Sequence, residues 1–354
     1  MKVTFGVIGR TATDSELCDG QTVKTRVLVS ELQNKYPDSE IVIADTYNYK
    51  KNPLKMVYSI INAMVKSDVV FVLLSRNGMK VIFPIINSMN IFLKKPILHD
   101  CIGGGWDTFV QRYSGIGREI KKFTVNWVES QNEKEKLNAL GYDNVEYLPN
   151  FKRLNCIAEE KLKLVYPEQF RFCTFSRVNE AKGVGKACEA VIEINRELGY
   201  VKATLDIYGP IEDNYDTFIN KYVEQANGAI TYHGAVPSEK SVETLTDAYA
   251  LLFPTTFYGE GFPGTLIDAF SSGVPIIATD WHLNGEIIQD GYTGLLYDPE
   301  QPEKLKELME KLMDDPALVF EMRKNCLTEA KKYSPDKVMD VINAKINAVC
   351  NDKA

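Results

Sequence analysis

The sequence predicts an α/β protein made of two domains, each with a parallel β-sheet covered by helices on both faces. At 354 residues, the chain exceeds the size at which a single hydrophobic core stops growing. Short apolar runs alternate with amphipathic segments, which is typical of parallel sheets buried on both faces. This alternation restarts after about residue 150. We therefore expect Rossmann-like domains at 1–150 and 151–333, followed by a terminal segment at 334–354.

Six strands are expected in the first domain, with helices between them. The apolar runs that predict the strands are VTFGVIG (3–9), IVIAD (41–45), VVFVLLS (69–75), PILHD (96–100), FTVNWV (123–128) and VEYLPN (145–150). Helical spacing of apolar residues predicts helices near 23–34, 54–66, 81–92, 106–113 and 131–140.

The second domain repeats the pattern with six more apolar runs. They are FRFCTFSRV (170–178), ATLDIYG (203–209), AITYHGAV (229–236), AYALLFPT (248–255), VPIIATD (274–280) and TGLLYD (293–298). From Ser334 onward, Ser-Pro-Asp is a capping signal, and apolar residues then recur at helical spacing. We expect a final helix, and a return to the first domain is one of the two placements open to it.

Charge is distributed unevenly along the chain. The net charge of −7 argues against nucleic acid as a partner. Residues 1–150 nevertheless carry 19 Lys/Arg and 16 Asp/Glu, whereas residues 151–354 carry 22 and 32. Basic clusters lie at Lys50–Lys55, Lys94-Lys95 and Lys121-Lys122. A solvated face and a contact with an anionic membrane surface or acceptor are both open readings of these clusters.

The sequence also indicates a soluble protein of a reducing compartment. No run approaches the roughly 18 apolar residues of a membrane span, and MKVTFGVIGR is typical of a first strand rather than a signal peptide. The seven cysteines show no metal-binding or pairing pattern. We expect a cytoplasmic protein, with the inner face of the membrane as a further possible location.

The segment from Glu260 to Pro275 predicts a site at the carboxyl end of a strand. Glu260 stands in a glycine-rich loop, and Pro263 suits the first position of a helix because its missing N–H needs no partner there. The free amides of the following residues, Gly264, Thr265 and Leu266, would then face a bound anion, most simply a phosphate.

A second candidate site follows the first strand of the second domain. Arg177 and Lys182 are five positions apart in a loop that ends at Gly183. Two converging cations can neutralise a diphosphate as it departs. Taken alone, the pair is more simply explained as solvated surface residues, but the same domain also contains the Glu260 loop.

The order of these motifs resembles the retaining glycosyltransferases of family 4, which have the two-domain GT-B fold. The matching segments are Ser176-Arg177 with Lys182-Gly183, the strand-end segments after them, Glu260 to Pro275, and Gly285 to Pro299. The resemblance is specific over residues 172–300 and thinner in the first domain. It implies two Rossmann-like domains facing each other across a cleft.

The resemblance implies a role for each matching residue. Arg177 and Lys182 would clamp the diphosphate of a nucleotide-sugar, and Glu260 would bind hydroxyls of the donor sugar. Asp268 stands where the family usually has the glutamate that binds the ribose, and an aspartate side chain is one methylene shorter. The rest of the donor loop would be Gly261, Phe262, Pro263, Gly264 and Thr265.

In the first domain the resemblance concerns two short segments. Gly20 and Lys24 stand where the family has a glycine-containing loop facing the donor phosphates, although the usual second glycine is missing. Lys24 fits a surface helix position equally well, and Asp19 fits an N-cap. His99 resembles the family's active-site histidine, which touches the donor sugar.

We therefore expect a retaining, metal-independent transferase that moves a sugar from a nucleotide-sugar, by family habit a UDP-sugar, to a glycan or lipid-linked glycan in bacterial polysaccharide assembly. No cofactor is expected, since the nucleotide-sugar is a substrate. Metal-ligand spacings, the Gly-x-Ser-x-Gly elbow of hydrolases and the Gly-x-Gly-x-x-Gly of oxidoreductases are absent from the sequence. A silent nucleotide-sugar binder and a GT-B UDP-sugar epimerase remain alternatives.

Overall fold

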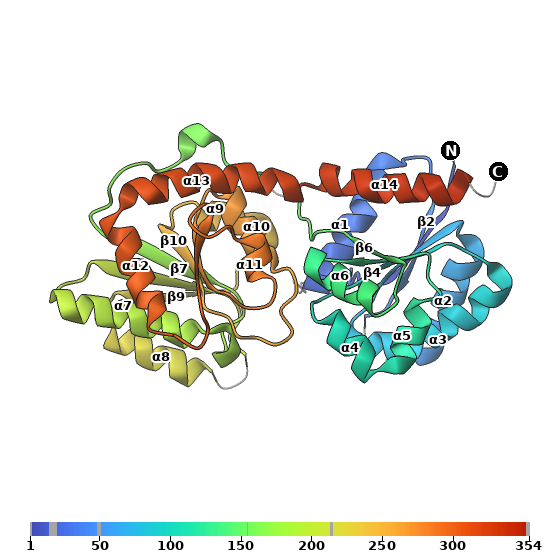
Figure 1. The fold of residues 1–354 in the computed structure, drawn as a ribbon, viewed down its shortest axis with the longest axis horizontal. Coiled ribbons are helices and arrows are strands. Elements are labelled where there is room, and N and C mark those ends of the chain that lie inside the picture. The colour runs from blue at the N-terminus through green and yellow to red at the C-terminus, as the bar shows by residue number, and fades with distance from the viewer. Residues whose placement is uncertain (1, 14–19, 48–50, 154, 213–214, 352–354) are drawn as a thin grey trace. The chain divides into compact units, whose positions relative to one another are not determined.

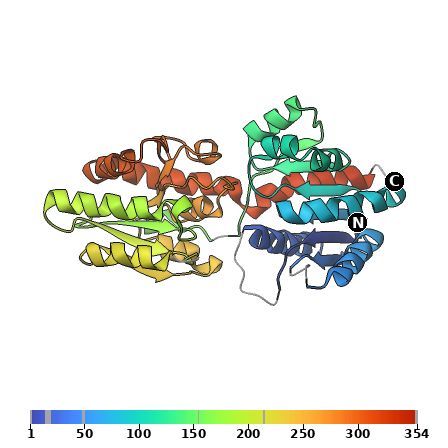
Figure 2. The same cartoon turned by 90° about the horizontal axis from the view of Figure 1, so that it is seen from below.

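The computed structural model describes residues 2–13, 20–47, 51–153, 155–212 and 215–351. The chain forms two compact units, Met1–Arg153 with Pro335–Ala354, and Leu154–Ser334. Each unit contains a six-stranded parallel sheet with helices on both faces (Figure 1, Figure 2). The predicted α/β fold with two Rossmann-like domains is confirmed, and it is the GT-B fold.

The sheet of the first unit has the order β2-β1-β3-β4-β5-β6, and all its pairs are parallel. Its strands are β1 (Phe5–Gly9), β2 (Ile41–Asp45), β3 (Val69–Leu73), β4 (Ile97–Asp100), β5 (Val125–Val128) and β6 (Val145–Tyr147). The helices between them are α1 (Gly20–Lys35), α2 (Pro53–Lys66), α3 (Arg76–Leu93), α4 (Trp106–Arg112), α5 (Ser114–Ile120) and α6 (Gln131–Ala139). Helices α2 to α5 share one apolar core with the sheet.

The sheet of the second unit has the order β12-β11-β10-β7-β8-β9. Its strands are β7 (Phe170–Phe175), β8 (Ala203–Tyr208), β9 (Ile230–Gly234), β10 (Ala250–Phe253), β11 (Ile276–Thr279) and β12 (Gly294–Tyr297). One face is covered by α7 (Val184–Leu198), α8 (Asp216–Gln225), α12 (Lys304–Asp314) and the start of α13 (Pro316–Ala330). The other face is covered by α9 (Ser241–Leu245), α10 (Gly264–Ser271) and α11 (Asn284–Ile287). Single 3-10 turns lie at Glu159–Lys161, Glu180–Lys182, Ser238–Lys240 and Lys331–Tyr333.

The last helix, α14 (Pro335–Asn351), packs on the first unit together with α1 (Figure 1). Val338, Ile342 and other apolar residues of α14 share a core with Phe5 and Leu28. Tyr36 donates a hydrogen bond to Asn343 Oδ1 over 3.0 Å. The final helix therefore returns to the first domain, which is one of the two placements that the sequence left open.

Two helices of the first unit differ from the sequence expectation. Helix α3 begins at Arg76, five residues before the expected start, and it continues through Pro84. Gly78 and Pro84 are poor helix formers, so the periodic signal is weak there although Met79, Ile82 and Phe83 are buried. The short helix α5 was not expected from the sequence. Among the described helices, none combines the length and hydropathy needed to cross a membrane.

Candidate functional site

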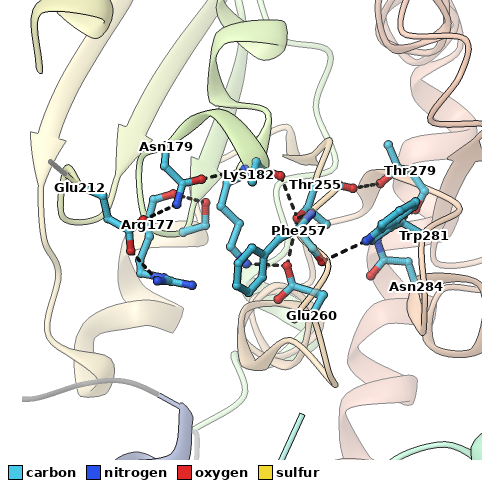
Figure 3. A network of polar contacts seen from close by, with 12 residues as sticks. Arg177, Asn179, Lys182, Glu212, Thr255, Phe257, Glu260, Thr279, Trp281 and Asn284 are labelled. Atoms are coloured by element: carbon cyan, nitrogen blue, oxygen red, sulfur yellow. Dashed lines mark hydrogen bonds and ion pairs between the residues drawn. The ribbon is translucent and has the colours of Figure 1, made fainter. Parts of the chain in front are cut away.

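Loops at the carboxyl ends of neighbouring strands meet in the second unit (Figure 3). The loop after β7 carries Arg177 and Lys182, the loop after β10 carries Glu260, and the loop after β11 carries Trp281. Ligands of open parallel sheets bind at this edge. The structure thus brings together the two cations and the carboxylate that the sequence singled out.

Gly183 allows the first two loops to lie in contact. Its φ is 71°, and a Cβ built on it would lie 2.2 Å from the carbonyl oxygen of Pro254. Only glycine fits such an approach in a left-handed conformation. The amide of Thr256 donates to the carbonyl of Ala181 over 2.8 Å, which ties the same two loops together.

Lys182 and Glu260 form an ion pair inside this loop cluster. Lys182 Nζ contacts Glu260 Oε2, and both side chains are less than one tenth exposed. The hydroxyl of Thr255 donates to the same carboxylate oxygen over 3.0 Å. Because both charges are shielded from water, their positions are fixed more firmly than those of a surface pair.

Arg177 occupies a more open position on the opposite side of Lys182. Its guanidinium pairs with Glu212, which follows β8, and Asn179 donates to the second oxygen of the same carboxylate over 2.6 Å. The hydrogen bond from Asn179 and the charge of Arg177 lower the pKa of Glu212. A shallow polar depression lined by Asn179, Ile211, Glu212 and Tyr215 opens beside this pair.

The ring of Phe257 contacts both cations. The guanidinium carbon of Arg177 lies 5.2 Å from the ring centroid and the ammonium of Lys182 lies 5.1 Å from it. The carbonyl of Phe257 accepts hydrogen bonds from the indole of Trp281 over 3.0 Å and from the amide of Glu260 over 3.1 Å. Phe257 therefore lies against two positive charges, each of which also pairs with a carboxylate, Arg177 with Glu212 and Lys182 with Glu260. A ligand with both phosphate and hydroxyl groups could exchange partners with these ion pairs.

Helix α10 begins one residue later than the sequence suggested. Pro263 has an extended ψ of 118° and precedes the helix, whose first residue is Gly264. This corrects the prediction of Pro263 as the first helical residue. The hydroxyl of Thr265 is buried and has no hydrogen-bond partner among the described residues. The ring of Phe262 packs on the ring of Tyr333, with 5.0 Å between the centroids, so the side chain of Phe262 anchors the loop to the core.

Asp268 lies on α10 and is 2% exposed. Its Oδ1 accepts a hydrogen bond from the hydroxyl of Ser241 over 2.9 Å. Ser241 begins α9, so this bond joins two helices of one face of the sheet. The ribose contact predicted for Asp268 stays a prediction, as do the roles of Gly261 and the other loop residues toward a donor.

In the first unit, Lys24 lies between two carboxylates and not on an open surface. Its ammonium contacts Asp100 Oδ1 over 2.7 Å and Glu129 Oε1 over 2.8 Å, with all three side chains buried. The two carboxylates keep this lysine charged despite its burial, and its pKa is raised. The surface-helix reading of Lys24 is thus wrong, and its contact with donor phosphates stays a prediction.

Gly20 is the first residue of α1 and is exposed, and a Cβ built on it would meet nothing within 4 Å. Its described neighbours therefore do not require a glycine there. The contact of Gly20 with donor phosphates stays a prediction. Asp19, the proposed N-cap, lies outside the described residues, as does Lys50 of the first basic cluster.

His99 is enclosed within the first unit. Its Nδ1 lies 2.8 Å from Asn126 Oδ1, and the rings of Phe83, Trp106 and Phe123 surround it at 5.0 to 5.5 Å. Burial lowers the pKa of His99 to about 4. A contact with a sugar would require an accessible ring edge, and the side chain is fully buried. We therefore assign His99 no contact with a sugar.

The other two histidines also have protein partners. His233 hydrogen-bonds to Asp206 Oδ1 through Nε2 and stacks on Tyr208 at 4.7 Å. These contacts give His233 a structural role. His282 lies against the rings of Trp281 and Tyr258, at 4.7 and 5.7 Å.

Sequence reasoning missed Phe257, Glu212, Asn179 and Thr255 as parts of the site. Glu212 follows β8, so the rule that placed Arg177 at the carboxyl end of a strand covers it as well. Phe257 stands three positions before Glu260, next to a loop that the sequence predicts to bind a ligand. The sequence does not indicate the direction in which an aromatic ring in such a loop points.

Comparisons with known proteins concern the second unit and the fold of the chain. Residues 158–333 match the family model of glycosyl transferases group 1. An uncharacterized glycosyltransferase of Methanocaldococcus jannaschii is 25% identical over 199 residues, 55% of this chain and 48% of the relative. The D-inositol 3-phosphate glycosyltransferase of Paenarthrobacter aurescens is 23% identical over 195 residues, 54% of this chain and 46% of the relative. The chain thus spans about half the length of these curated relatives.

A solved structure has the same fold over nearly the whole chain. The Anabaena protein HepE in complex with UDP-glucose superposes with a TM-score of 0.76 at 12% identity, covering 98% of this chain and 100% of that one. At this identity the likeness shows the fold alone. Residues 158–333 are thus similar to the glycosyl transferases group 1 family, and the two-domain chain has the GT-B fold.

Proposed function

We propose that this protein is a retaining, metal-independent glycosyltransferase that moves a sugar from a UDP-sugar to a glycan or lipid-linked glycan acceptor. The observation that carries the proposal is the convergence of Arg177 and Lys182 on the ring of Phe257, with the carboxylate of Glu260 beside them. The two cations suit a diphosphate and the carboxylate suits sugar hydroxyls.

Departure of the nucleoside diphosphate is the step that these cations assist. The bond between the anomeric carbon and the phosphate oxygen breaks, and negative charge grows on the diphosphate. Arg177 and Lys182 would stabilise this charge from fixed positions, so the proposed reaction needs neither a divalent metal nor a cofactor.

Glu260 would orient the donor sugar by accepting hydrogen bonds from its hydroxyl groups. This carboxylate accepts a hydrogen bond from Thr255 and contacts Lys182. The loop from Gly261 to Thr265 would add backbone amides, and the unpartnered hydroxyl of Thr265 would add one further donor. Asp268 would contact the ribose, directly or through a water.

Retention follows if the acceptor oxygen attacks from the face that the phosphate leaves. The new bond forms at the anomeric carbon while the acceptor's proton passes to the departing phosphate oxygen, which lies on the same face. No covalent nucleophile is assigned. The first unit would supply the acceptor side, and the choice of UDP-sugar is supported by the UDP-glucose bound to the Anabaena protein of the same fold.

A thermal-shift screen of nucleotide-sugars tests the proposal. A ligand present at a hundred times its Kd stabilises the native state by about 2.7 kcal/mol, which corresponds to a rise in Tm of several degrees. We expect a UDP-sugar to give this rise, and a subset of glycan acceptors to give sugar transfer. A donor that binds without transfer to any acceptor would favour the silent binder, and conversion of the bound sugar would favour the epimerase.

A further inference from the structure

Two adjacent helices of the first unit present an unusually apolar outer surface. Helices α2 and α3 pack side by side on one face of the sheet (Figure 1). Their inner faces are buried in the core, whereas their outer faces carry large exposed apolar side chains. We call this surface the α2–α3 face, and its exposed apolar residues are Leu54, Tyr58, Ile61, Val65, Val81, Ile91 and Phe92.

The exposed apolar side chains follow the outer lines of both helices. Leu54, Tyr58, Ile61 and Val65 are spaced at intervals of four, three and four residues, which places them on one side of α2. Leu54 is 83% exposed and Phe92 is 86% exposed. Single exposed apolar residues are normal on a protein surface, but seven large ones on two neighbouring helices indicate a binding surface.

The same face is positively charged and contains no acidic residue. The segment 51–66 has Lys51, Lys55 and Lys66, and the segment 76–95 has Lys94 and Lys95 besides Arg76 and Lys80. Arg76 and Lys80 contact α4 and the residues beside it, the first at Gly104 and Phe109 and the second at Tyr113, and are not counted as part of the face. Neither segment contains Asp or Glu, although the whole chain is net negative. The nearest acidic residues flank the face, Asp68 after α2 and Glu119 on α5, and Glu119 pairs with Lys122.

The direction of the helices places the charges around the apolar rows. Both helices connect parallel strands of one sheet, so they run in the same direction. Lys51 and Lys55 therefore lie at one end of the face, and Lys66 lies at the other end with Lys94 and Lys95. The face is thus apolar along its length and cationic at both ends.

We propose that the α2–α3 face binds the surface of an anionic lipid bilayer. Apolar side chains would enter the region between headgroups and acyl chains, while the lysine ammonium groups would contact lipid phosphates. A two-fold contact between copies is disfavoured because it would set the lysines of one copy against those of the other. Nucleic acid is disfavoured because the exposed side chains are mainly aliphatic and offer few stacking rings. The inference goes beyond sugar transfer and does not depend on it.

Co-sedimentation of the full chain with vesicles tests this inference. We expect binding to phosphatidylcholine vesicles that contain phosphatidylglycerol, weak binding to phosphatidylcholine alone, and a decrease as salt is added. Each lysine near an anionic surface contributes about fivefold to the partition coefficient, so Lys55→Gln with Lys66→Gln should lower it about 25-fold. Leu54→Ser with Phe92→Ser should lower it by about tenfold or more for each side chain.

Matched variants of the second unit serve as controls. Leu198→Ser with Tyr200→Ser removes exposed apolar side chains, and Lys221→Gln with Lys324→Gln removes exposed lysines. Both controls should bind vesicles like the unaltered protein. Because all the altered side chains are exposed, circular dichroism and Tm should be unchanged in every variant.

Several results would overturn the inference. They are absence of vesicle binding, equal binding to neutral and anionic vesicles, or equal losses in the controls. Self-association that depends on Leu54 and Phe92, without vesicle binding, would assign the face to a second copy instead. Binding of UDP-sugars, measured by thermal shift without vesicles, reports on the proposed transferase separately, so failure of one proposal is distinguishable from failure of the other.

Discussion

Lys182 and Glu260 lie 78 residues apart in the sequence and form a buried ion pair at the carboxyl edge of the second sheet. Both side chains are also residues to which we assign direct contacts with the donor. The pair therefore holds the two charged groups of the site in position. A bound diphosphate would compete with Glu260 for the ammonium of Lys182.

Removing one member of this pair should cost more stability than removing both. Lys182→Met leaves the carboxylate of Glu260 buried without its counter-charge, which we expect to lower the free energy of unfolding by about 3 kcal/mol. Lys182→Met with Glu260→Gln should lower it by clearly less. Urea unfolding of both variants measures the difference, and simple additivity with the Glu260→Gln variant would contradict the coupling.

Phe257 should act as a positioning residue for the two cations. Each cation–ring contact contributes about 0.5–2 kcal/mol, so Phe257→Leu should lower kcat/KM for the donor about tenfold. Phe257→Tyr retains the ring and should retain most of the activity. Comparable activity in the leucine and tyrosine variants would show that the ring does not hold Arg177 and Lys182.

The burial of His99 should make the first unit sensitive to acid. The pKa of His99 in the folded protein is about 4, below the ordinary 6.5, so the unfolded state binds more protons between these values. Stability is therefore lost as the pH falls from 6.5 to 4. Glu133 has the opposite effect, because burial raises its pKa to about 7. The folded state therefore binds more protons at this residue, and the free energy of unfolding decreases as the pH rises from 4.5 to 7.

The His99→Gln variant separates the effect of His99 on the pH dependence of stability from that of Glu133. His99→Gln cannot be protonated and can still hydrogen-bond to Asn126. Relative to the unaltered protein, it should gain about 3 kcal/mol of unfolding free energy between pH 6.5 and 4. Tryptophan fluorescence during urea unfolding is a suitable readout, since the ring centroids of Trp106 and His99 are 5.4 Å apart. A difference that does not change with pH would show that His99 is not kept neutral by burial.

The fold and most of the candidate site could be predicted because both depend on local patterns. Apolar runs of five to nine residues separated by amphipathic segments indicate the twelve strands of the described residues. Residues after strand ends, such as Arg177 and Glu260, lie where parallel sheets bind ligands. What could not be predicted is the direction of individual side chains. His99 is the last residue but one of β4, close to where an active-site residue would lie, but its ring packs against Phe83 of the helix layer.

Contacts between residues far apart in the chain could not be predicted from the sequence either. In the sequence, Lys24 fits a surface position of a helix. In the structure, its ammonium contacts Asp100 and Glu129, which are 76 and 105 residues away in the chain. The ring of Phe257 meets Arg177 only because Gly183 allows the two loops to touch. These are tertiary effects, so the chemical types of the site residues were predictable and their partners were not.

The most direct test of the central claim is the rate of UDP release from the donor that stabilises the protein most, measured with acceptor present. Arg177 is about half exposed and Arg177→Ala should leave the fold intact while lowering this rate by about a hundredfold or more. Arg196→Ala removes an exposed arginine that pairs with Glu193 and should have no effect. Unaltered turnover in the Arg177→Ala variant would contradict the account.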